Sequence, residues 1–353
     1  MNAKKKITIQ EIAKALNTSP STVSRALQDH PRIGAEMRER VKRYAQDHDY
    51  QPDFRASSLR KGSGRTIGVL VPQIDINFFA RVLRGIDEVA TEADYNVLIC
   101  QSNDSYKREV QLVKSMLYGK VDGLIASISI ETLDDDHFNM LTRRGLPLVL
   151  FDKVIESMKV SKVLIDDHMG TYISMQHLIS NGYKRIAYFG GPQYLNIYYH
   201  RARGYIDALK DSGIEIDDNL IFYNTMERVG GYKAMQKILQ MDYPPDAICS
   251  CSDFAALGAL VCAKEKGIRV PNQIAITGFA NESFGSLLEP PMTSIEQNPI
   301  EMGRKSAELL IEQMENTKKD FIPRTITLKP SLVIRESSAY KSESNPTFDK
   351  LSL

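Results

Sequence analysis

Apolar residues near the start of the chain recur at helical spacing in two short segments. One apolar face carries Ile9, Ile12, Ala13 and Leu16, and the other carries Val23, Ala26 and Leu27. The first segment opens with a capping box, Thr8-Ile9-Gln10-Glu11, and the second opens with Ser19-Pro20, an N-cap followed by proline at the first helical position. A third amphipathic segment runs from Gly34 to Asp47. The pattern therefore predicts three helices around a small closed core.

The second segment leaves hydroxyl side chains and an arginine on its polar face. That face carries Pro20, Ser21, Thr22, Ser24, Arg25 and Gln28. Short hydroxyl side chains permit close approach to phosphates, and arginine can bind guanine O6 and N7 in the major groove. A scaffold helix, a short turn and such a second helix are typical of a helix-turn-helix motif. The alternative is a helical hairpin with a solvated face.

From Arg65 onward, apolar runs of strand length alternate with helical stretches. The runs are TIGVLVP, YNVLIC, VDGLIAS and LPLVLFD, followed by RIAYFGG, LIFYN, DAICSCS and QIAITGF. Helices are predicted at Phe78–Ala93, Tyr106–Tyr118, Thr171–Ser180, His200–Ser212, Gly230–Met241 and Phe254–Lys266. This order predicts an α/β fold of two similar lobes, each with a parallel sheet, and a ligand site between them. Helix Ile300–Glu315 and the strands of RTITLKPSLVI would cross back and complete the sheets.

Charge is distributed unevenly along the chain. Residues 1–65 hold 14 Lys/Arg and 7 Asp/Glu, whereas the remainder holds 31 and 37, although the net charge of the whole is only +1. A basic N-terminal part on an acidic body indicates that the first part meets a polyanion.

Several classes of protein are disfavoured by the sequence. No apolar run is long enough for a membrane helix, and the charged N-terminus has no apolar stretch behind it, so we expect a cytoplasmic protein. The four cysteines favour buried free thiols, and the six histidines show no metal spacing. Without a phosphate-binding glycine loop or a nucleophile elbow, we expect no enzyme, cofactor or metal. A transport receptor is the more serious rival, because the body alone would suit one, but the predicted headpiece and the lack of a secretory signal disfavour it.

A short segment between the two parts has the marks of a hinge. In YQPDFRASSLRKGSGR, a helix of about seven residues between Pro52 and Gly62 is too short to be stable alone. It also presents Leu59 next to Arg60 and Lys61. A segment that folds only on DNA could insert such a leucine into a base step of the minor groove.

These stretches resemble a known family. Thr8–Leu27, Tyr50-Gln51-Pro52 and Ala56-Ser57-Ser58-Leu59 are similar to the headpiece and hinge helix of the LacI/GalR (lactose-repressor) family of bacterial transcription regulators. The resemblance extends over the body, most specifically in CSDFAALGAL, GIRVPNQIAITGF and PPMTSIEQNPIEMGRKSAELL, and implies the fold of periplasmic sugar-binding proteins. It implies that bases are read by Pro20, Ser21 and Arg25, that phosphates are held by Thr22 and Ser24, and that Leu59 is the hinge leucine. Further DNA contacts are expected at Thr8, Arg32, Ala56 and Arg60. Pro20 departs from relatives with Tyr or Thr there, so it can only make apolar contact.

The resemblance also implies a set of effector contacts. These are Phe78, Phe79, Asp166, Arg201 and Asp253. Aromatic rings can stack on a sugar ring, and arginine and aspartate can fix its hydroxyls or a carboxylate. Four of these residues have an ordinary alternative. Phe79 could be core, Asp166 and Asp167 could be a loop pair, and Arg201 with Arg203 could lie on a solvated face. Asp253 could be the N-cap of helix Phe254–Lys266, alone or in addition to an effector contact.

One position departs from the family pattern at the expected effector site. Many relatives have an aspartate where this chain has Ala280, and Asn281 and Glu282 are the candidates to replace it.

The prediction for the whole chain follows from these parts. Residues 1–51 form the DNA-binding headpiece, 52–64 the hinge helix and linker, 65–337 the effector-binding and dimerisation domain, and 338–353 a polar, disordered tail. The tail has no heptad repeat, which disfavours a tetramerising coiled coil. We predict a homodimeric repressor that binds a pseudo-palindromic operator in double-stranded DNA and responds to a carbohydrate effector. The sequence identifies neither the effector nor the operator, nor whether the effector releases or promotes DNA binding.

Overall fold

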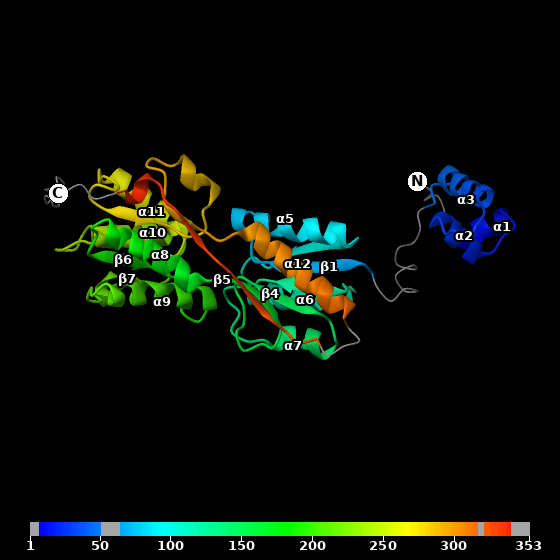
Figure 1. Ribbon diagram of the computed structural model, residues 1–353, viewed down its shortest axis with the longest axis horizontal. Coiled ribbons are helices and arrows are strands. Elements are labelled where there is room, and N and C mark those ends of the chain that lie inside the picture. Colours follow the sequence, from blue (N-terminus) through cyan, green and yellow to red (C-terminus); the bar gives the residue numbers. More distant parts are fainter. Residues whose placement is uncertain (1–6, 51–63, 120, 317–320, 340–353) are drawn as a thin grey trace. The chain divides into compact units, whose positions relative to one another are not determined.

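The computed structural model describes residues 7–50, 64–119, 121–316 and 321–339 (Figure 1). The chain divides into two compact units, Met1–Gly64 and Arg65–Leu353. The first unit is helical, and the second is built from alternating strands and helices.

The first unit contains the three predicted helices. They are α1 (Ile9–Ala15), α2 (Pro20–Leu27) and α3 (Ala35–Asp47). Asn17, in the turn between α1 and α2, has φ of 52°, the left-handed conformation that asparagine tolerates. Ile12, Val23 and Val41, one from each helix, are fully buried against one another in a common core. The helical periodicity of the sequence is therefore confirmed, and each helix contributes to one small core.

The N-lobe of the second unit holds a parallel sheet of six strands. They are β1 (Thr66–Val71), β2 (Asn96–Gln101), β3 (Gly123–Ala126), β4 (Leu148–Phe151), β5 (Ser161–Ile165) and β11 (Thr325–Leu328). Their order is β11-β5-β4-β3-β1-β2, which leaves β2 and β11 at the edges. One face is covered by α5 (Asn77–Glu92) and α12 (Pro299–Glu315), and the other by α6 (Tyr106–Tyr118) and α7 (Asp136–Arg143).

The C-lobe repeats this plan with a smaller sheet. Its strands are β6 (Ile186–Phe189), β7 (Ile221–Phe222), β8 (Ala247–Ser250) and β9 (Ala275–Thr277), in the order β7-β6-β8-β9. One face is covered by α8 (Asp167–Ser180) and α9 (Asn196–Asp211), and the other by α10 (Arg228–Ile238) and α11 (Asp253–Glu265). Short 3₁₀ turns occur at Asp218–Leu220, Ser283–Leu287 (η2) and Glu336–Ser338. The predicted two-lobed α/β fold is confirmed.

Glycines allow the N-lobe helices α5 and α12 to cross at close range. A Cβ atom added to Gly85 would lie 2.1 Å from the carbonyl oxygen of Ile300, and one added to Gly303 would lie 2.0 Å from that of Val82. Any larger residue at either position would push the helices apart. This close crossing fixes the position of α5, whose first turn carries Phe78 and Phe79.

The chain passes between the lobes three times. It leaves the N-lobe after β5, returns through β10 (Ser294–Glu296) into α12, and crosses again between β11 and β12 (Ser331–Val333). In Figure 1 these crossings run between the lobe that contains α5 and α12 and the lobe that contains α8 to α11. The predicted return of the C-terminal strands is confirmed, with β12 pairing antiparallel to β10.

Three elements, β5, α7 and β10, were not predicted from the sequence. In β5 the polar residues Ser161 and Lys162 interrupt the apolar pattern, yet both are buried. The Lys162 ammonium group donates to the carbonyl oxygens of Glu156 at 2.9 Å and Met158 at 2.6 Å, and burial lowers its pKa. These bonds to the preceding loop satisfy the buried lysine, and they are not visible in the sequence pattern.

Candidate DNA-reading helix and effector site

The first turn of α2 is held by hydroxyl groups. Ser19 Oγ accepts the backbone N–H of Thr22 at 3.1 Å, as the predicted N-cap, and lies 2.8 Å from Ser21 Oγ and 2.9 Å from Thr22 Oγ1. Pro20 occupies the first helical position. These hydroxyls therefore lie at the positive end of the helix, where anionic groups are stabilised.

The exposed face of α2 carries the predicted base-reading residues. Pro20, Ser21 and Arg25 are exposed, whereas Thr22 and Ser24 are half-buried. Within the described residues, no hydrogen bond or ion pair engages the Arg25 guanidinium group. Its donors are therefore available to a partner.

Two further predicted contacts lie outside α2. The Thr8 hydroxyl accepts the Glu11 N–H at 3.2 Å, and the Thr8 N–H donates to the Glu11 carboxylate at 2.8 Å, so the predicted capping box is confirmed. The Arg32 side chain is exposed, and its backbone N–H donates to His30 Nδ1 at 3.2 Å. Both side chains are at the surface of the headpiece, and their contact with DNA stays a prediction.

The predicted hinge contacts fall outside the described residues. Ala56, Leu59 and Arg60 all belong to 51–63. Their proposed roles rest on the sequence alone.

Phe78 and Phe79 lie in the first turn of α5 and are each only 5% exposed. The rings meet edge to face with centroids 5.1 Å apart, and Phe79 also meets Phe151 edge to face at 6.3 Å. Lys153 Nζ is 6.0 Å from the centre of the Phe79 ring. Both rings thus pack in the N-lobe core, and their contact with an effector stays a prediction.

Arg201 is a buried residue of α9 and does not lie on a solvated face. Its Nε donates to Asp167 Oδ1 at 2.7 Å, and a terminal nitrogen donates to the carbonyl oxygen of Cys251 at 2.8 Å. Its guanidinium carbon lies 3.7 Å from the centre of the Phe279 ring. Burial raises the pKa of Asp167 to about 6, although Arg201 favours the charged form. The solvated-face alternative for Arg201 is therefore wrong.

The carboxylate that meets Arg201 belongs to Asp167, the neighbour of the predicted effector residue Asp166. Asp166 is the N-cap of α8, and its Oδ1 accepts the Met169 N–H at 2.9 Å. Asp167, the next residue, is the one buried against Arg201. The position of the helix start decides which of the two carboxylates points inward.

Asp253 supports a loop and does not cap α11. The N-cap is Ser252, whose Oγ accepts the Phe254 N–H at 3.1 Å, so the N-cap alternative for Asp253 is wrong. Asp253 Oδ2 accepts the backbone N–H of Glu282 at 2.6 Å, and Oδ1 accepts the Ser294 hydroxyl at 2.6 Å. Burial raises the pKa of Asp253 to about 6. The Asp253 carboxylate thus hydrogen-bonds both the loop that follows β9 and the start of β10.

That segment contains the departure at Ala280. Asn281 is held by other residues of the body, because its Oδ1 accepts from Arg335 at 2.8 Å and its Nδ2 donates to Glu296 at 2.9 Å. Glu282 is only 4% exposed, and its Oε1 atom has no hydrogen-bond partner among the described residues. Of the two candidates to replace the missing aspartate, Glu282 therefore has the free acceptor.

A second set of residues joins the lobes and was not predicted. Asn196, the first residue of α9, donates to the carbonyl oxygen of Asp152 and accepts the Val154 N–H, both at 3.0 Å. The Asp152 carboxylate is buried and accepts the Ser127 hydroxyl at 3.2 Å, and burial raises its pKa. The sequence shows Asn196 only as a polar residue near the start of a helix. It does not reveal that this residue has hydrogen-bond partners in the other lobe.

The interlobe junction therefore brings together most of the predicted effector residues. Arg201 and Asp253 reach it from α9 and α11 of the C-lobe, and Phe279 stacks on Arg201. The first turn of α5, which carries Phe78, comes from the N-lobe, and Arg81 of the same helix lies 3.2 Å from the Glu296 carboxylate. Aromatic, cationic and carboxylate groups in this arrangement can bind a polar ring compound.

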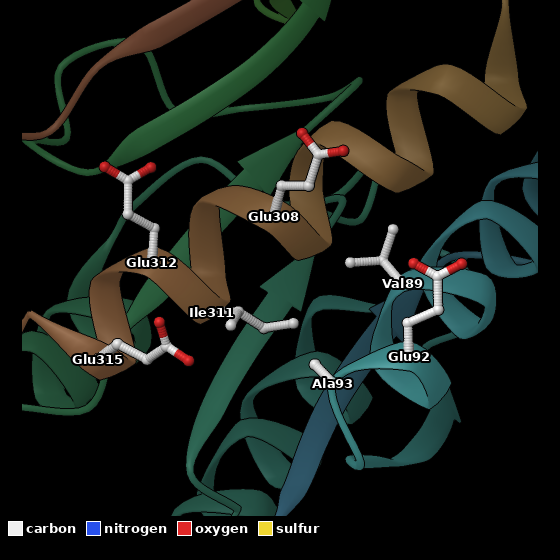
Figure 2. Close-up of a pocket in the computed structure, with 7 residues that line it drawn as sticks. All are labelled: Val89, Glu92, Ala93, Glu308, Ile311, Glu312 and Glu315. Atoms are coloured by element: carbon white, nitrogen blue, oxygen red, sulfur yellow. The ribbon is translucent and has the colours of Figure 1, made fainter.

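A separate groove lies between α5 and α12 on the N-lobe. Figure 2 shows Val89, Ala93 and Ile311 between acidic side chains. The groove has a volume of about 380 Å³, and its acidic residues are Glu92, Glu308, Glu312 and Glu315. It contains none of the predicted effector residues, and its charge makes it unsuitable for contact with a phosphate backbone.

Two cysteines lie at the end of β8. Cys249 and Cys251 are buried, and burial raises their pKa values, to about 11 for Cys249 and about 12 for Cys251, so both thiols are held in the unreactive neutral form. No group of three or more His, Cys, Asp or Glu residues in the described part of the chain could hold a metal ion.

Comparison with known families agrees with this arrangement. Residues 8–53 match the model for bacterial regulatory proteins of the lacI family. Residues 64–331 match the model for periplasmic binding proteins and the sugar binding domain of the LacI family. The chain belongs to the LacI family. As a family member, it is a DNA-binding transcriptional regulator with an effector-binding body.

Similar proteins of the LacI family are named as repressors and regulators. The HTH-type transcriptional repressor CytR of Escherichia coli K12 is 32% identical over 319 residues, which is 89% of this chain and 93% of CytR. The structure of the transcriptional regulator CelR–cellobiose complex has 28% identity and a TM-score of 0.72, and the match covers 94% of this chain and all of that one.

The lac repressor shares the fold of this LacI-family chain. The structure of its dimer bound to operator and the anti-inducer ONPF has a TM-score of 0.83 at 22% identity, over 95% of this chain and 99% of that one. Among the described residues, no helix has both the length and the apolar character needed to cross a bilayer.

Proposed function

We propose that this LacI-family regulator is a transcriptional repressor that binds a pseudo-palindromic operator as a homodimer and is controlled by a carbohydrate effector. It acts in the cytoplasm, where it can reach DNA, and has no enzymatic activity. The observation that carries the proposal is the exposed face of α2, on which an unpaired Arg25 lies beside short hydroxyl side chains.

The headpiece supplies the means of reading DNA. In this proposal Pro20, Ser21 and Arg25 contact bases, while Thr22 and Ser24 contact phosphates. The closed core of the headpiece supports this assignment, because it fixes the orientation of α2. The +7 charge of residues 1–65 adds attraction to the phosphate backbone.

The junction between the lobes supplies the effector site. The proposal assigns ligand contacts to Phe78, Phe79, Arg201 and Asp253, with Glu282 in place of the missing aspartate. Asp166 supports the site only by starting α8, and its buried neighbour Asp167 orients Arg201. The carbohydrate class is supported by the match to the sugar binding domain and by the cellobiose bound in the CelR complex.

An exposed sheet edge supports the homodimer. Strand β2 is at the edge of the N-lobe sheet, and its residues Leu98 and Ile99 are 46% and 47% exposed. Unpaired edge strands with exposed apolar side chains favour association with another chain. Pairing through this edge would also bring two headpieces together for two half-sites.

Removing residues 1–63 tests whether DNA binding depends on the headpiece and effector binding on the body. The truncated body should stay folded, because its core lies entirely in the second unit, and should bind sugars but not DNA. Retardation of DNA in a gel, with full-length protein as reference, shows whether DNA binding is lost. A thermal-shift screen of neutral sugars and sugar acids checks the second property, since a ligand at about 100 times its Kd adds roughly 2.7 kcal/mol of stability. Specific operator retardation by the truncated body would contradict the proposal.

A further inference from the structure

The first residue of α9 hydrogen-bonds the backbone of the other lobe at two points. Asn196 Oδ1 accepts the Val154 N–H, and Asn196 Nδ2 donates to the carbonyl oxygen of Asp152, both at 3.0 Å. Asn196 is only 6% exposed, so both bonds are shielded from water. Loss of a partner at such a place leaves a buried polar group unsatisfied, which is costly. One amide side chain of the C-lobe therefore holds both ends of residues 152–154, the segment that directly follows β4.

The backbone of the 152–154 segment has an uncommon conformation. Asp152 has φ of 58°, in the left-handed region that aspartate tolerates but non-glycine residues seldom adopt. Contacts within the N-lobe also hold the segment, because Asp152 Oδ2 accepts the Ser127 hydroxyl at 3.2 Å and the carbonyl oxygen of Lys153 accepts the Ile128 N–H at 3.0 Å. An uncommon backbone conformation that several elements support indicates a functional role for the side chains it positions.

The segment carries a buried cation next to a predicted effector residue. Lys153 is only 7% exposed, and its ammonium group lies 3.1 Å from Asp104 Oδ1 and 6.0 Å from the centre of the Phe79 ring. A buried charge is stable only when it is paired, so the Asp104 contact restricts where the ammonium group can lie. The position of the 152–154 segment therefore determines the position of a cation beside Phe79.

Two neighbours of Asn196 in sequence also contact the N-lobe. The Tyr194 hydroxyl donates to the carbonyl oxygen of Ile130 at 2.9 Å, and His200 Nε2 lies 3.0 Å from Glu156 Oε1. Both contacts are exposed to water, where such pairs contribute little to stability. The buried bonds of Asn196 are therefore the strongest of the contacts that this part of the C-lobe makes with the N-lobe.

From these contacts we propose that Asn196 is a positioning residue that holds the C-lobe to the 152–154 segment and so sets where Lys153 lies in the proposed effector site. Rotation of one lobe away from the other must break both Asn196 bonds. The part that concerns the effector rests on the proposed function, whereas the hold between the lobes is a property of the ligand-free protein. If no sugar bound, the role in effector binding would fail, and the hold between the lobes would still be tested by the experiments below.

Hydrogen exchange of the Val154 amide in the ligand-free, full-length protein tests the hold directly. This N–H has its acceptor in the other lobe, so its protection requires the two lobes to stay together. Asn196→Ala removes the acceptor and should speed exchange at Val154 by roughly tenfold or more. Asn219→Ala, which removes an exposed asparagine of the C-lobe, is the control and should change nothing at this amide. Unchanged Val154 exchange in Asn196→Ala would overturn the proposal.

A second variant distinguishes a hold between the lobes from a local bond to Val154, and it serves also if Asn196→Ala fails to fold. Tyr194→Phe removes only the hydroxyl that reaches Ile130 and leaves Asn196 in place. Because both contacts resist the same lobe movement, Val154 exchange should rise roughly twofold or more. Tyr199→Phe, which removes the hydroxyl of an exposed tyrosine on the same helix, is the matched control and should leave it unchanged. Equal exchange in the two tyrosine variants would show that Asn196 acts only locally, and the proposal would fail.

Discussion

At the scale of single residues, α2 of the headpiece has some side chains that pack on the core and others that are free to contact DNA. Val23 and Ala26 are fully buried and hold the helix on the core. Arg25, between them in sequence, is exposed and has no partner in the described residues. Arg25 is exposed although its neighbours on this short helix are buried, which indicates that it contacts a partner outside the headpiece.

Replacement of Arg25 by alanine should therefore alter sequence preference. We expect a loss of about 1–3 kcal/mol in operator binding and a relaxed preference at one base pair, because a bidentate contact to guanine would be lost. Competition binding against single-base variants of a selected operator measures both. Arg43→Ala, which removes an exposed cation of α3, is the control and should lower affinity evenly, if at all. If Arg25→Ala also lowered affinity equally for all operator variants, Arg25 would contact a phosphate and not a base.

Arg201, in contrast to the exposed Arg25, is buried and has partners within the protein. Its hydrogen bonds to Asp167 and Cys251 and its stacking on Phe279 use its charge within the protein. Its removal would leave the buried Asp167 without its cation, which is a costly change. A weakened effector response in an Arg201 variant is therefore informative only when folding is measured beside it.

At the scale of elements, α2 depends on its first turn. The helix has only eight residues, a length that is not stable alone in water. Packing through Val23 and Ala26 supplies part of the stability, and the Ser19 cap supplies another part.

The cap can be removed without touching the exposed face. Ser19→Ala should destabilise the turn by about 1 kcal/mol, because the Thr22 N–H loses its acceptor, which corresponds to roughly fivefold faster amide exchange there. Ser19→Asn should behave like the parent, since asparagine is an equally good N-cap. Hydrogen exchange of the full-length protein at residues 21–23 distinguishes these cases. Equal exchange in Ser19→Ala and the parent would show that packing alone orders the turn.

At the scale of the whole molecule, the body buries several carboxyl groups near the junction between its lobes. Burial raises the pKa of Asp167 to about 6, of Asp253 to about 6 and of Glu282 to about 7. The folded body therefore binds protons that the unfolded chain has released. Such groups reduce stability progressively as pH rises through the range between their unfolded and folded pKa values.

We accordingly expect the Tm of the body without residues 1–63 to be lower at about pH 7 than at about pH 5. His177 opposes this trend, because burial lowers its pKa and the folded state loses stability when it is protonated. A change of 1 kcal/mol corresponds to roughly 2–4 °C in a domain of this size. Thermal unfolding followed by circular dichroism across this range is the measurement. A Tm that rises with pH would show that the carboxyls do not dominate.

The sequence by itself determined most of the helices and strands and the class of protein. Local signals were sufficient for the headpiece, since caps and periodicity act within a few residues, as at Ser19 and Asn17. Alternating strands and helices were sufficient for the two lobes, because parallel sheets require long crossover connections. The family resemblance added the roles of the residues on the exposed face of α2 and the candidate residues Arg201 and Asp253.

Tertiary structure alone decided which groups meet. Asp167 rather than Asp166 lies against Arg201, because the start of α8 uses the first carboxylate as its cap and turns the second inward. The Asp253 carboxylate accepts the backbone N–H of Glu282, a residue 29 positions away, and Asn196 of the C-lobe hydrogen-bonds Asp152 and Val154 of the N-lobe. Periodicity reports which face of an element is buried but not which neighbour covers it. Contacts between lobes therefore depend on how the chain crosses between the two sheets.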